Sequence, residues 1–305
     1  MDELRFKSNN KIVLITPYFG KFPQWFDLYL YSCSRQKNID FVYFTDCELP
    51  QKVYQNTIFI PTTFQEYCDK VSKSLEIDFH PNESYKLCDV KPFYGIIHND
   101  LINRYDFWGF ADIDLIFGDL SIIINEQKLT DYDFITTHTN RVAGHLALVR
   151  SKSSFTTSCL NIPDWKNKLQ CQEHISVDED DWALLLYPQL KWISRFYRHI
   201  CRRLHIPMKY CYEGIVNKVF CNKYTRRSFY EYGTTPLPQN GQKWLFNPNE
   251  GTMTNPSGKE IPYLHFLFFK KNRYKKTDVY WKDDYVKVSA PYTSVITITN
   301  EGING

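Results

Sequence analysis

The sequence predicts an α/β fold whose central sheet is mostly parallel and flanked by helices. In the first half of the chain, short β-branched or aromatic runs alternate with helical patterns, and the connections between them are short. Such alternation is typical of strand–helix–strand units, whose strands lie parallel in one sheet. With 305 residues, of which 43% are hydrophobic and 23% charged, the chain can form one large core or two medium ones, and global disorder is excluded.

Three strands are expected near the N-terminus. The first is residues 11–16 (KIVLIT), a β-branched run that ends in a turn at residues 17–20. A helix with Pro23 in its first turn is expected to follow this turn. The second and third strands are predicted at residues 41–45 (FVYFT) and 57–60.

The middle of the chain continues this pattern. A polar helix is predicted at residues 64–75, and a second helix follows the run YKLCDVKPFY and reaches about residue 103. A hydrophobic strand at residues 106–111 (DFWGFA) leads directly into an acidic segment. Two more strands are predicted at residues 133–137 and 145–150.

The last part of the chain has a different character. Its pattern is helical from residue 175 to 221 and then loop-rich and aromatic, with a late strand at residues 261–268. We therefore expect a core of residues 1–174 and a helical and loop-rich second region of residues 175–305, whose late strand returns to the core.

Charge and cysteine content limit the class of protein. The formal net charge of +3 is too small to predict nucleic-acid binding. The nine cysteines are an odd number without CxxC spacing, which favours free thiols in a reducing cytoplasm over a disulfide framework. The polar N-terminus does not resemble a signal peptide, and no apolar run is long enough to predict a transmembrane helix.

The clearest chemical signal is the pair Asp112 and Asp114, directly after an apolar strand. Two carboxylates so close together in an apolar setting are costly unless a cation compensates them, and Mg²⁺ and Mn²⁺ prefer oxygen ligands. Ligands also collect at the carboxyl ends of strands in open α/β sheets. Alternatively, both residues only end a strand and begin a turn. Because Asp119 follows in the same run, we favour a metal site with room for phosphates.

A second signal is the late strand YLHF, which contains His265 and is followed by Lys270 and Lys271. A histidine in an apolar strand is commonly a core residue. Beside two aspartates, however, neutral imidazole suits a third metal ligand. Either lysine can neutralise a diphosphate as a point charge, or both can belong to a solvated basic surface.

Two further segments are candidates for binding or catalysis. Asp178 and Glu179 lie in an acidic run that opens a helix, where acids favour the helix dipole but can also contact sugar hydroxyls or act as a base. Gly144, next to small residues before a strand, allows close backbone approach to a ligand or simply makes a tight turn.

Basic residues gather between positions 191 and 227, where aromatic side chains are interleaved with them. Such a segment can contact an anionic membrane surface peripherally, or cover a domain with its long side chains. No nucleic-acid-binding motif accompanies it.

The runs KIVLITPYFG, FVYFTD, YKLCDVKPFYG and YDFWGFADIDLIFGD resemble a family of bacterial GT-A-type glycosyltransferases of capsule and lipopolysaccharide biosynthesis. The resemblance covers about residues 10–150, with weaker similarity at the acidic helix and the late strand. It implies a nucleotide-sugar donor, for example a UDP-sugar, bound at the sheet edge. A similarity to glycogenin-like retaining transferases is more distant, because the Gly-x-x-Lys-Pro-Trp sequence that follows their metal-binding histidine is absent after His265.

This resemblance implies roles for individual residues. The nucleotide would lie at Thr16, Pro17 and Tyr18, with Thr45 and Asp46 near the base. Lys86 and Asp89 would face the nucleotide or donor sugar. Asp112, Asp114 and His265 would hold Mn²⁺ or Mg²⁺, and the stereochemistry stays open between inversion and retention.

The sequence therefore favours a metal-dependent glycosyltransferase that acts on a glycan or lipid-linked acceptor in the cytoplasm, with peripheral contact to the inner face of the cytoplasmic membrane as a further possibility. One alternative is a metal-dependent nucleotidyltransferase or phosphohydrolase, although no GxxxxGK[ST] loop is present. Another is a non-enzymatic module that binds membranes or polyanions through residues 191–227.

Overall fold

The computed structural model describes residues 11–137, 142–186, 200, 203–204, 234–270, 280–282 and 284–305. Within these residues the fold is mixed α/β, with two six-stranded sheets and one two-stranded sheet. The expected basic segment at residues 191–227 lies outside the described residues, except for 200 and 203–204.

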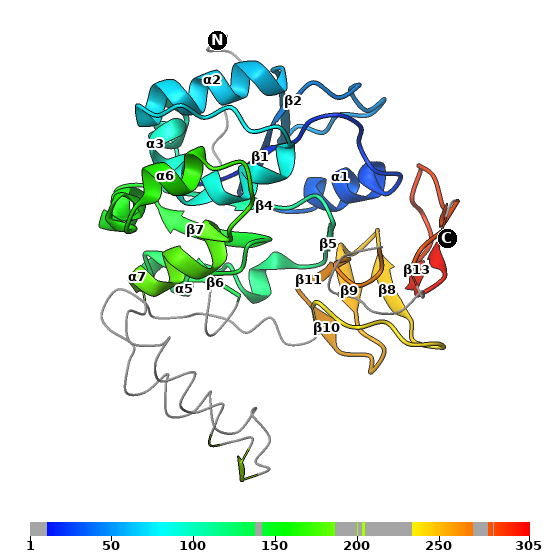
Figure 1. Ribbon diagram of the computed structural model, residues 1–305. Coiled ribbons are helices and arrows are strands. Elements are labelled where there is room, and N and C mark those ends of the chain that lie inside the picture. Colours follow the sequence, from blue (N-terminus) through cyan, green and yellow to red (C-terminus); the bar gives the residue numbers. More distant parts are fainter. Residues whose placement is uncertain are drawn as a thin grey trace.

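The central sheet has the strand order β3-β2-β1-β4-β7-β6 (Figure 1). Strands β1, β2, β3 and β4 are parallel to one another, and β7 is antiparallel to both of its neighbours. Their bounds are β1 Ile12–Pro17, β2 Ile39–Thr45, β3 Thr57–Pro61, β4 Phe107–Ala111, β6 Phe134–Thr136 and β7 Leu146–Arg150. All six lie close to the predicted positions.

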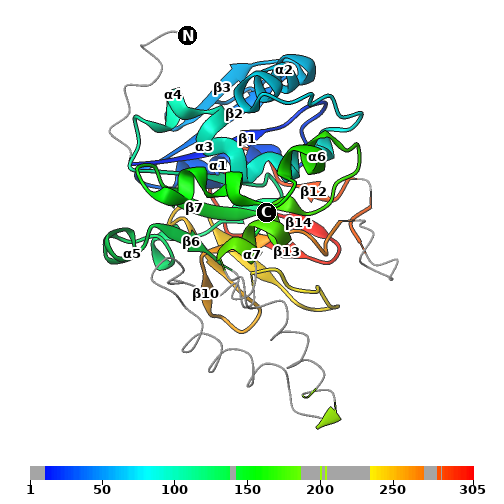
Figure 2. The same ribbon diagram turned by 60° about the vertical axis from the view of Figure 1, so that its left-hand side comes forward.

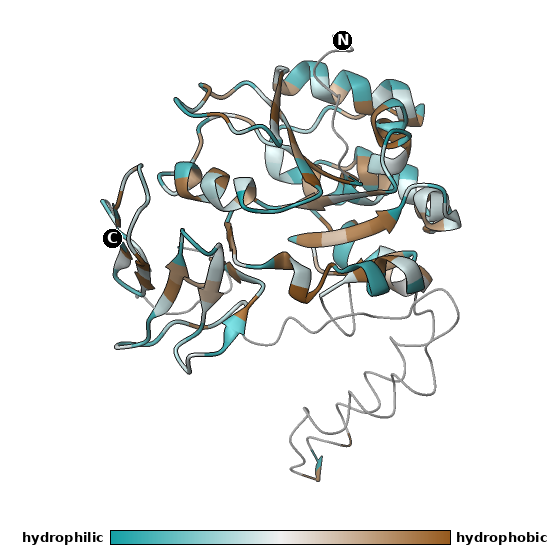
Figure 3. Cartoon of the chain, turned by 180° about the vertical axis from the view of Figure 1, so that it is seen from behind, coloured by the Kyte–Doolittle hydropathy of each residue, from teal (hydrophilic) through white to brown (hydrophobic). Residues whose placement is uncertain are grey.

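The central sheet is buried on both faces, and β1 shows why its sequence is apolar throughout. Successive side chains of a strand point to opposite faces. Ile12 and Leu14 accordingly pack into one core, and Val13 and Ile15 into another. In Figure 3 the central strands are mainly brown, as expected for a sheet covered on both sides.

Helices cover the two faces of this sheet. α1 (Phe26–Ser34) packs into the core that contains Leu14, and α2 (Phe64–Leu75) and α3 (Tyr94–Ile97) pack into the other. α2 coincides with its prediction, because Thr63 and Glu66 form a reciprocal capping box at its N-terminus. The remaining helices are α4 Asn99–Ile102, α5 Glu126–Asp131, α6 Trp165–Gln170 and α7 Trp182–Leu186.

The remaining helical segments are 3₁₀ helices and one π-type turn. The run YKLCDVKPFY forms a 3₁₀ helix, η2 (Ser84–Phe93), and the helix predicted after it, up to about residue 103, is present as the two short helices α3 and α4, with a break at His98. Two further 3₁₀ helices are η3 (Leu120–Ile122) and η4 (Ser154–Asn161), and the acidic run forms a π-type turn, η5 (Val177–Asp181).

The sequence did not predict a sheet in the C-terminal region, but residues 244–304 contain a second, mostly antiparallel sheet (Figure 1, yellow to red). Its order is β10-β9-β8-β13-β14-β12. The strands are only two to four residues long, too short to show a period-2 pattern. Their bounds are β8 Trp244–Asn247, β9 Thr252–Thr254, β10 Glu260–Ile261, β12 Val286–Lys287, β13 Ile296–Thr299 and β14 Gly302–Asn304.

The late strand is present as β11 (Tyr263–His265), which pairs antiparallel with β5 (Leu115–Phe117). Figure 2 shows the second sheet beside α1 and the central sheet. Trp244, Phe246 and Ile298 belong to the same core as Leu14. The proposed division between residues 174 and 175 is therefore crossed by a shared core.

Among the described residues, no helix is both long and apolar enough to cross a membrane.

Candidate functional site

A pocket of about 300 Å³ opens at the carboxyl ends of β1 and β4. The chain runs outward from β1 to β2 and β3 and then returns to place β4 on the other side of β1. The strand order thus reverses between β1 and β4, which is where open α/β sheets bind ligands. The pocket is lined by residues 15–19, 111–114, Pro23, Trp25, Ser84, Tyr85, Leu87, Cys88, Lys91, Tyr94 and Lys270.

Asp112 and Asp114 both line this pocket, as their position after β4 predicts. Each carboxylate has a lysine on one oxygen: Lys91 Nζ lies 2.6 Å from Asp112 Oδ1, and Lys270 Nζ lies 2.5 Å from Asp114 Oδ2. The Asp112 side chain is 36% exposed and that of Asp114 is 9% exposed. The pocket therefore combines two carboxylates with two ammonium groups.

His265 reaches Asp114 through the pairing of β11 with β5. Its register partner is Leu115, the residue directly after Asp114, and its Nε2 lies 3.4 Å from Asp114 Oδ2. Its ring also stacks on His145, with 4.2 Å between the ring centroids. Burial by itself raises the pKa of Asp114, but Lys270 and His265 outweigh it and hold that pKa well below its usual range.

These residues fit a divalent cation. Asp114 Oδ1 is buried and has no hydrogen-bond partner, which is costly for a carboxylate oxygen unless a positive charge approaches it. Carboxylate oxygens with one imidazole nitrogen suit Mn²⁺ or Mg²⁺. Of the three ligands expected from the sequence, Asp114 and His265 lie close to each other, whereas the Asp112 carboxylate contacts Lys91.

Lys91 is the main pocket residue that the sequence did not single out. It is buried, and its ammonium donates to Asp112 Oδ1 and to the Gly144 carbonyl, each at 2.6 Å. It lies within the run YKLCDVKPFYG, but its role follows from the 3₁₀ geometry of η2. Residues three apart are eclipsed in such a helix, so Tyr85, Cys88 and Lys91 all face the pocket.

Lys86 and Asp89, which were expected to face the donor, do not line the pocket. Both are fully buried on the other side of η2, one position away from its pocket-facing residues. Lys86 donates to the carbonyls of Lys168 and Glu173 and pairs with Asp89 at 3.0 Å. Lys86 and Asp89 thereby attach the segment that leads into η5 to η2.

Asp178, Glu179 and Gly144 lie together beside the pocket and do not line it. A Cβ on Gly144 would stand 2.6 Å from Glu179 Oε1 and 3.1 Å from Asp178 Oδ2, so a larger residue here would require these side chains to shift. Burial raises the pKa of Asp178 to about 8, against the opposing effect of the Lys91 ammonium. Glu179 is less buried than Asp178.

The residues expected at the nucleotide divide into two groups. Thr16, Pro17 and Tyr18 line the pocket, and the Thr16 hydroxyl donates to the Ala111 carbonyl at 2.7 Å, which ties the end of β1 to that of β4. Thr45 and Asp46 do not line it. Asp46 Oδ1 instead accepts the Gly20 N–H at 2.7 Å, and this bond holds the loop that carries Tyr18.

Two aromatic residues of the pocket were also not predicted from the sequence. The Trp25 indole donates to the Ile113 carbonyl at 2.7 Å and so fixes the backbone between the two aspartates. Tyr85 is 52% exposed, and its ring packs on His174. An exposed aromatic ring at a pocket is suited to stacking on a flat ligand group.

No curated protein matches this sequence. Among solved structures, the chain is similar to the glycosyltransferase GlyE of Streptococcus pneumoniae TIGR4, with 12% sequence identity and a TM-score of 0.31. The similarity covers 67% of this chain and 53% of that protein, so the chain spans about half the length of this solved structure.

A family model matches residues 14–289, which include every described pocket residue, and its description is a family of unknown function (DUF6625). The chain belongs to this family.

Proposed function

We propose that the protein transfers a sugar from a nucleotide-sugar donor, with a UDP-sugar as the first candidate, to a glycan acceptor. The observation that carries the proposal is the pocket between β1 and β4, where Asp112, Asp114 and Lys270 meet at the point of strand reversal. Such points bind nucleotides in open α/β sheets. The donor diphosphate needs positive charge near oxygen ligands, and this pocket contains both.

The arrangement of strands supports a GT-A-like fold. Four parallel strands in the order β3-β2-β1-β4 are followed at the edge by β7 and β6. The aspartate pair comes directly after β4, in the sequence DFWGFADIDLIFGD, which resembles GT-A-type glycosyltransferases. On this proposal, Thr16, Pro17 and Tyr18 contact the nucleotide.

The proposed chemistry follows from charge. Cleavage of the anomeric bond leaves negative charge on the nucleoside diphosphate, and groups that stabilise this charge lower the barrier. Asp114 and His265, with Asp112 if it turns from Lys91, would hold Mn²⁺ or Mg²⁺, which would supply Lewis-acid stabilisation of that leaving group. Lys270, whose side chain is 38% exposed, can donate to diphosphate oxygens as well as to Asp114.

For the acceptor side, Glu179 is the better candidate than Asp178 for contact with an acceptor hydroxyl. Asp178 is 2% exposed and is enclosed with Lys91, whereas Glu179 is partly exposed. A carboxylate that removes a proton must reach the attacking hydroxyl. The acceptor is proposed to be a glycan or lipid-linked saccharide of bacterial surface polysaccharide, with membrane contact through residues 191–227, which are mostly outside the described residues.

The test is nucleotide binding. We expect UDP with Mn²⁺ to raise the melting temperature more than UDP or Mn²⁺ alone, with GDP and CDP compared in parallel. Asp114→Asn is expected to remove the metal-dependent part of the shift, because it removes a charge that the cation needs. Asp131→Asn, an exposed change on α5 outside the pocket, is the matched control.

Two outcomes would contradict the proposal. The first is the absence of stabilisation by any nucleotide in the presence of Mn²⁺ or Mg²⁺. The second is a full metal-dependent shift in Asp114→Asn, which would remove the assigned site. A screen for hydrolysis of UDP-sugars by the unmodified protein then identifies the donor.

A further inference from the structure

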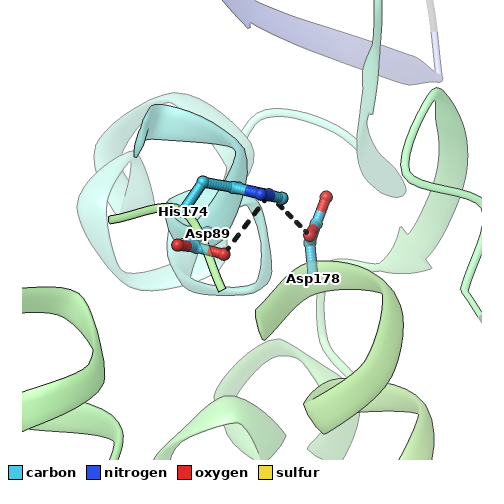
Figure 4. Close-up of side chains that lie close together, drawn as sticks. All are labelled: Asp89, His174 and Asp178. Atoms are coloured by element: carbon cyan, nitrogen blue, oxygen red, sulfur yellow. Dashed lines mark ion pairs between the residues drawn. The ribbon is translucent and has the colours of Figure 1, made fainter. Parts of the chain in front are cut away.

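Three ligand-type side chains converge beside the pocket without taking part in the proposed transfer. Asp89 comes from η2, Asp178 from η5, and His174 from the segment before η5 (Figure 4). One ligand atom of each lies within 4.8 Å of the others. Within the described ranges, this is the only such group of three histidine, cysteine, aspartate or glutamate residues.

Their spacing is close to that of ligands around a small cation. His174 Nε2 lies 3.5 Å from Asp89 Oδ1 and 4.0 Å from Asp178 Oδ1. Bonds of about 2.1 Å to Zn²⁺ in a tetrahedron place the ligand atoms about 3.4 Å apart. To reach that spacing, the His174–Asp178 distance would shorten by about 0.6 Å, and the Asp89–Asp178 distance, which is within 4.8 Å, would shorten by at most about 1.4 Å.

An independent observation is the state of Asp178. Its side chain is 4% exposed, and Oδ1, which faces His174 Nε2, has no hydrogen-bond partner. The nearby Lys91 ammonium donates to Asp112 and Gly144 instead. A buried carboxyl oxygen without a partner is unfavourable, and a cation would supply the missing interaction.

The surroundings of Asp89 and His174 resemble the outer shell of a metal site. Asp89 Oδ2 forms an ion pair with the Lys86 ammonium and accepts a hydrogen bond from the Ile175 N–H, both at 3.0 Å. Oδ1 accepts from the Val177 N–H at 2.8 Å and still faces His174. Tyr85 packs on the His174 ring, with 4.7 Å between centroids. Such contacts orient carboxylate and imidazole ligands.

We propose that Asp89, His174 and Asp178 form a divalent-cation site, best suited to Zn²⁺, that is separate from the Asp112–Asp114 pocket. One nitrogen and two oxygen ligands suit Zn²⁺ better than Ca²⁺ or Mg²⁺, which prefer oxygen. The ion joins η5 to η2, and η2 carries Lys91 and the wall of the pocket. This inference is independent of sugar transfer.

The experiment uses the full chain with Asp112→Asn and Asp114→Asn, so that the pocket carboxylates no longer bind a cation. Titration of this variant with Zn²⁺ by calorimetry is expected to show one ion per chain. Addition of His174→Gln should weaken the binding at least tenfold. His80→Gln is the matched control, because His80 also lies beside two aspartates, Asp69 and Asp78, but on the surface.

Co²⁺ provides a second readout that needs no change in the cluster itself. The Asp112→Asn and Asp114→Asn variant should show the intense visible absorption of tetrahedral Co²⁺, and Zn²⁺ should displace it. The proposal is overturned if this variant binds no Zn²⁺ and gives no Co²⁺ spectrum. It is equally overturned if His174→Gln leaves both signals unchanged, since the ion is then held elsewhere, or if His80→Gln abolishes them.

Discussion

At the scale of single residues, the two lysines of the pocket differ in what they can do. Lys91 is buried and has a second fixed bond, to the Gly144 carbonyl, so it holds the orientation of Asp112. Lys270 is 38% exposed and sits on the more deeply buried Asp114. On the proposed function, a diphosphate in the pocket would reach Lys270 more readily than Lys91, because the Lys270 side chain is more exposed.

Another single residue, His98, gives a prediction on pH and stability. Its ring is buried against Phe44 and Tyr94, and its Nε2 lies 2.8 Å from the Tyr67 hydroxyl. Burial, assisted by Lys70, lowers the pKa of His98 well below its usual range. The unfolded chain takes up a proton near pH 6.5, but the folded chain does not, so stability falls as pH drops below about 6.5.

The measurement is denaturant unfolding at pH 7.5 and 5.5. The contribution of His98 should lower the free energy of unfolding by up to about 1.4 kcal/mol for each pH unit below pH 6.5. His98→Gln keeps a polar partner for Tyr67 but cannot be protonated, so the difference between the two pH values should shrink. An identical difference in both proteins would show that His98 does not contribute.

At the scale of elements, the 3₁₀ geometry of η2 determines which of its side chains face the pocket. The resemblance of YKLCDVKPFYG to glycosyltransferases implies a binding segment, and that much is available from the sequence. The period of three is not, because it follows from the 3₁₀ form of η2, which packs against η5. Lys91 therefore stands in the pocket, and Lys86 is buried behind it.

The exposed end of this helix face gives a prediction on nucleotide binding. Tyr85 lines the pocket and is 52% exposed, so Tyr85→Ala should leave the fold intact. If its ring stacks on the base or a sugar, its removal should weaken UDP binding about fivefold or more, as stacking contributes about 1–3 kcal/mol per base. Glu83→Ala, an exposed change just before η2, is the control. Equal affinity for UDP in both variants would remove Tyr85 from the site.

Which strands pair, and in which register, also cannot be predicted from the local sequence. The aspartate pair and His265 were both visible as candidates, because each follows or lies in an apolar run. Their contact depends on β11 pairing with β5 in one register, across almost 150 positions of the chain. A shift by one residue would turn His265 to the opposite face. The residue types of the site were thus predictable, and their distances were not.

At the scale of the whole molecule, the second sheet belongs to the same hydrophobic core as one face of the central sheet. Phe246 on β8 is fully buried, pairs with Ile296 on β13 and contacts the ring of Tyr31 on α1. The sequence predicted the central sheet from its apolar strands but missed this sheet, whose strands are only two to four residues long. We infer that both sheets unfold together.

Substitution of Phe246 tests this cooperativity. Phe246→Ala should lower the free energy of unfolding by about 3–5 kcal/mol, because it leaves a large cavity in the shared core. Hydrogen exchange should then show an equal loss of protection for amides of β1 and β13, as expected for one cooperative unit. Leu245 is a 38% exposed neighbour on the same strand, so Leu245→Ala should change the free energy of unfolding and the exchange protection much less. Lost protection in β13 with unchanged protection in β1 would instead mean that the second sheet unfolds independently.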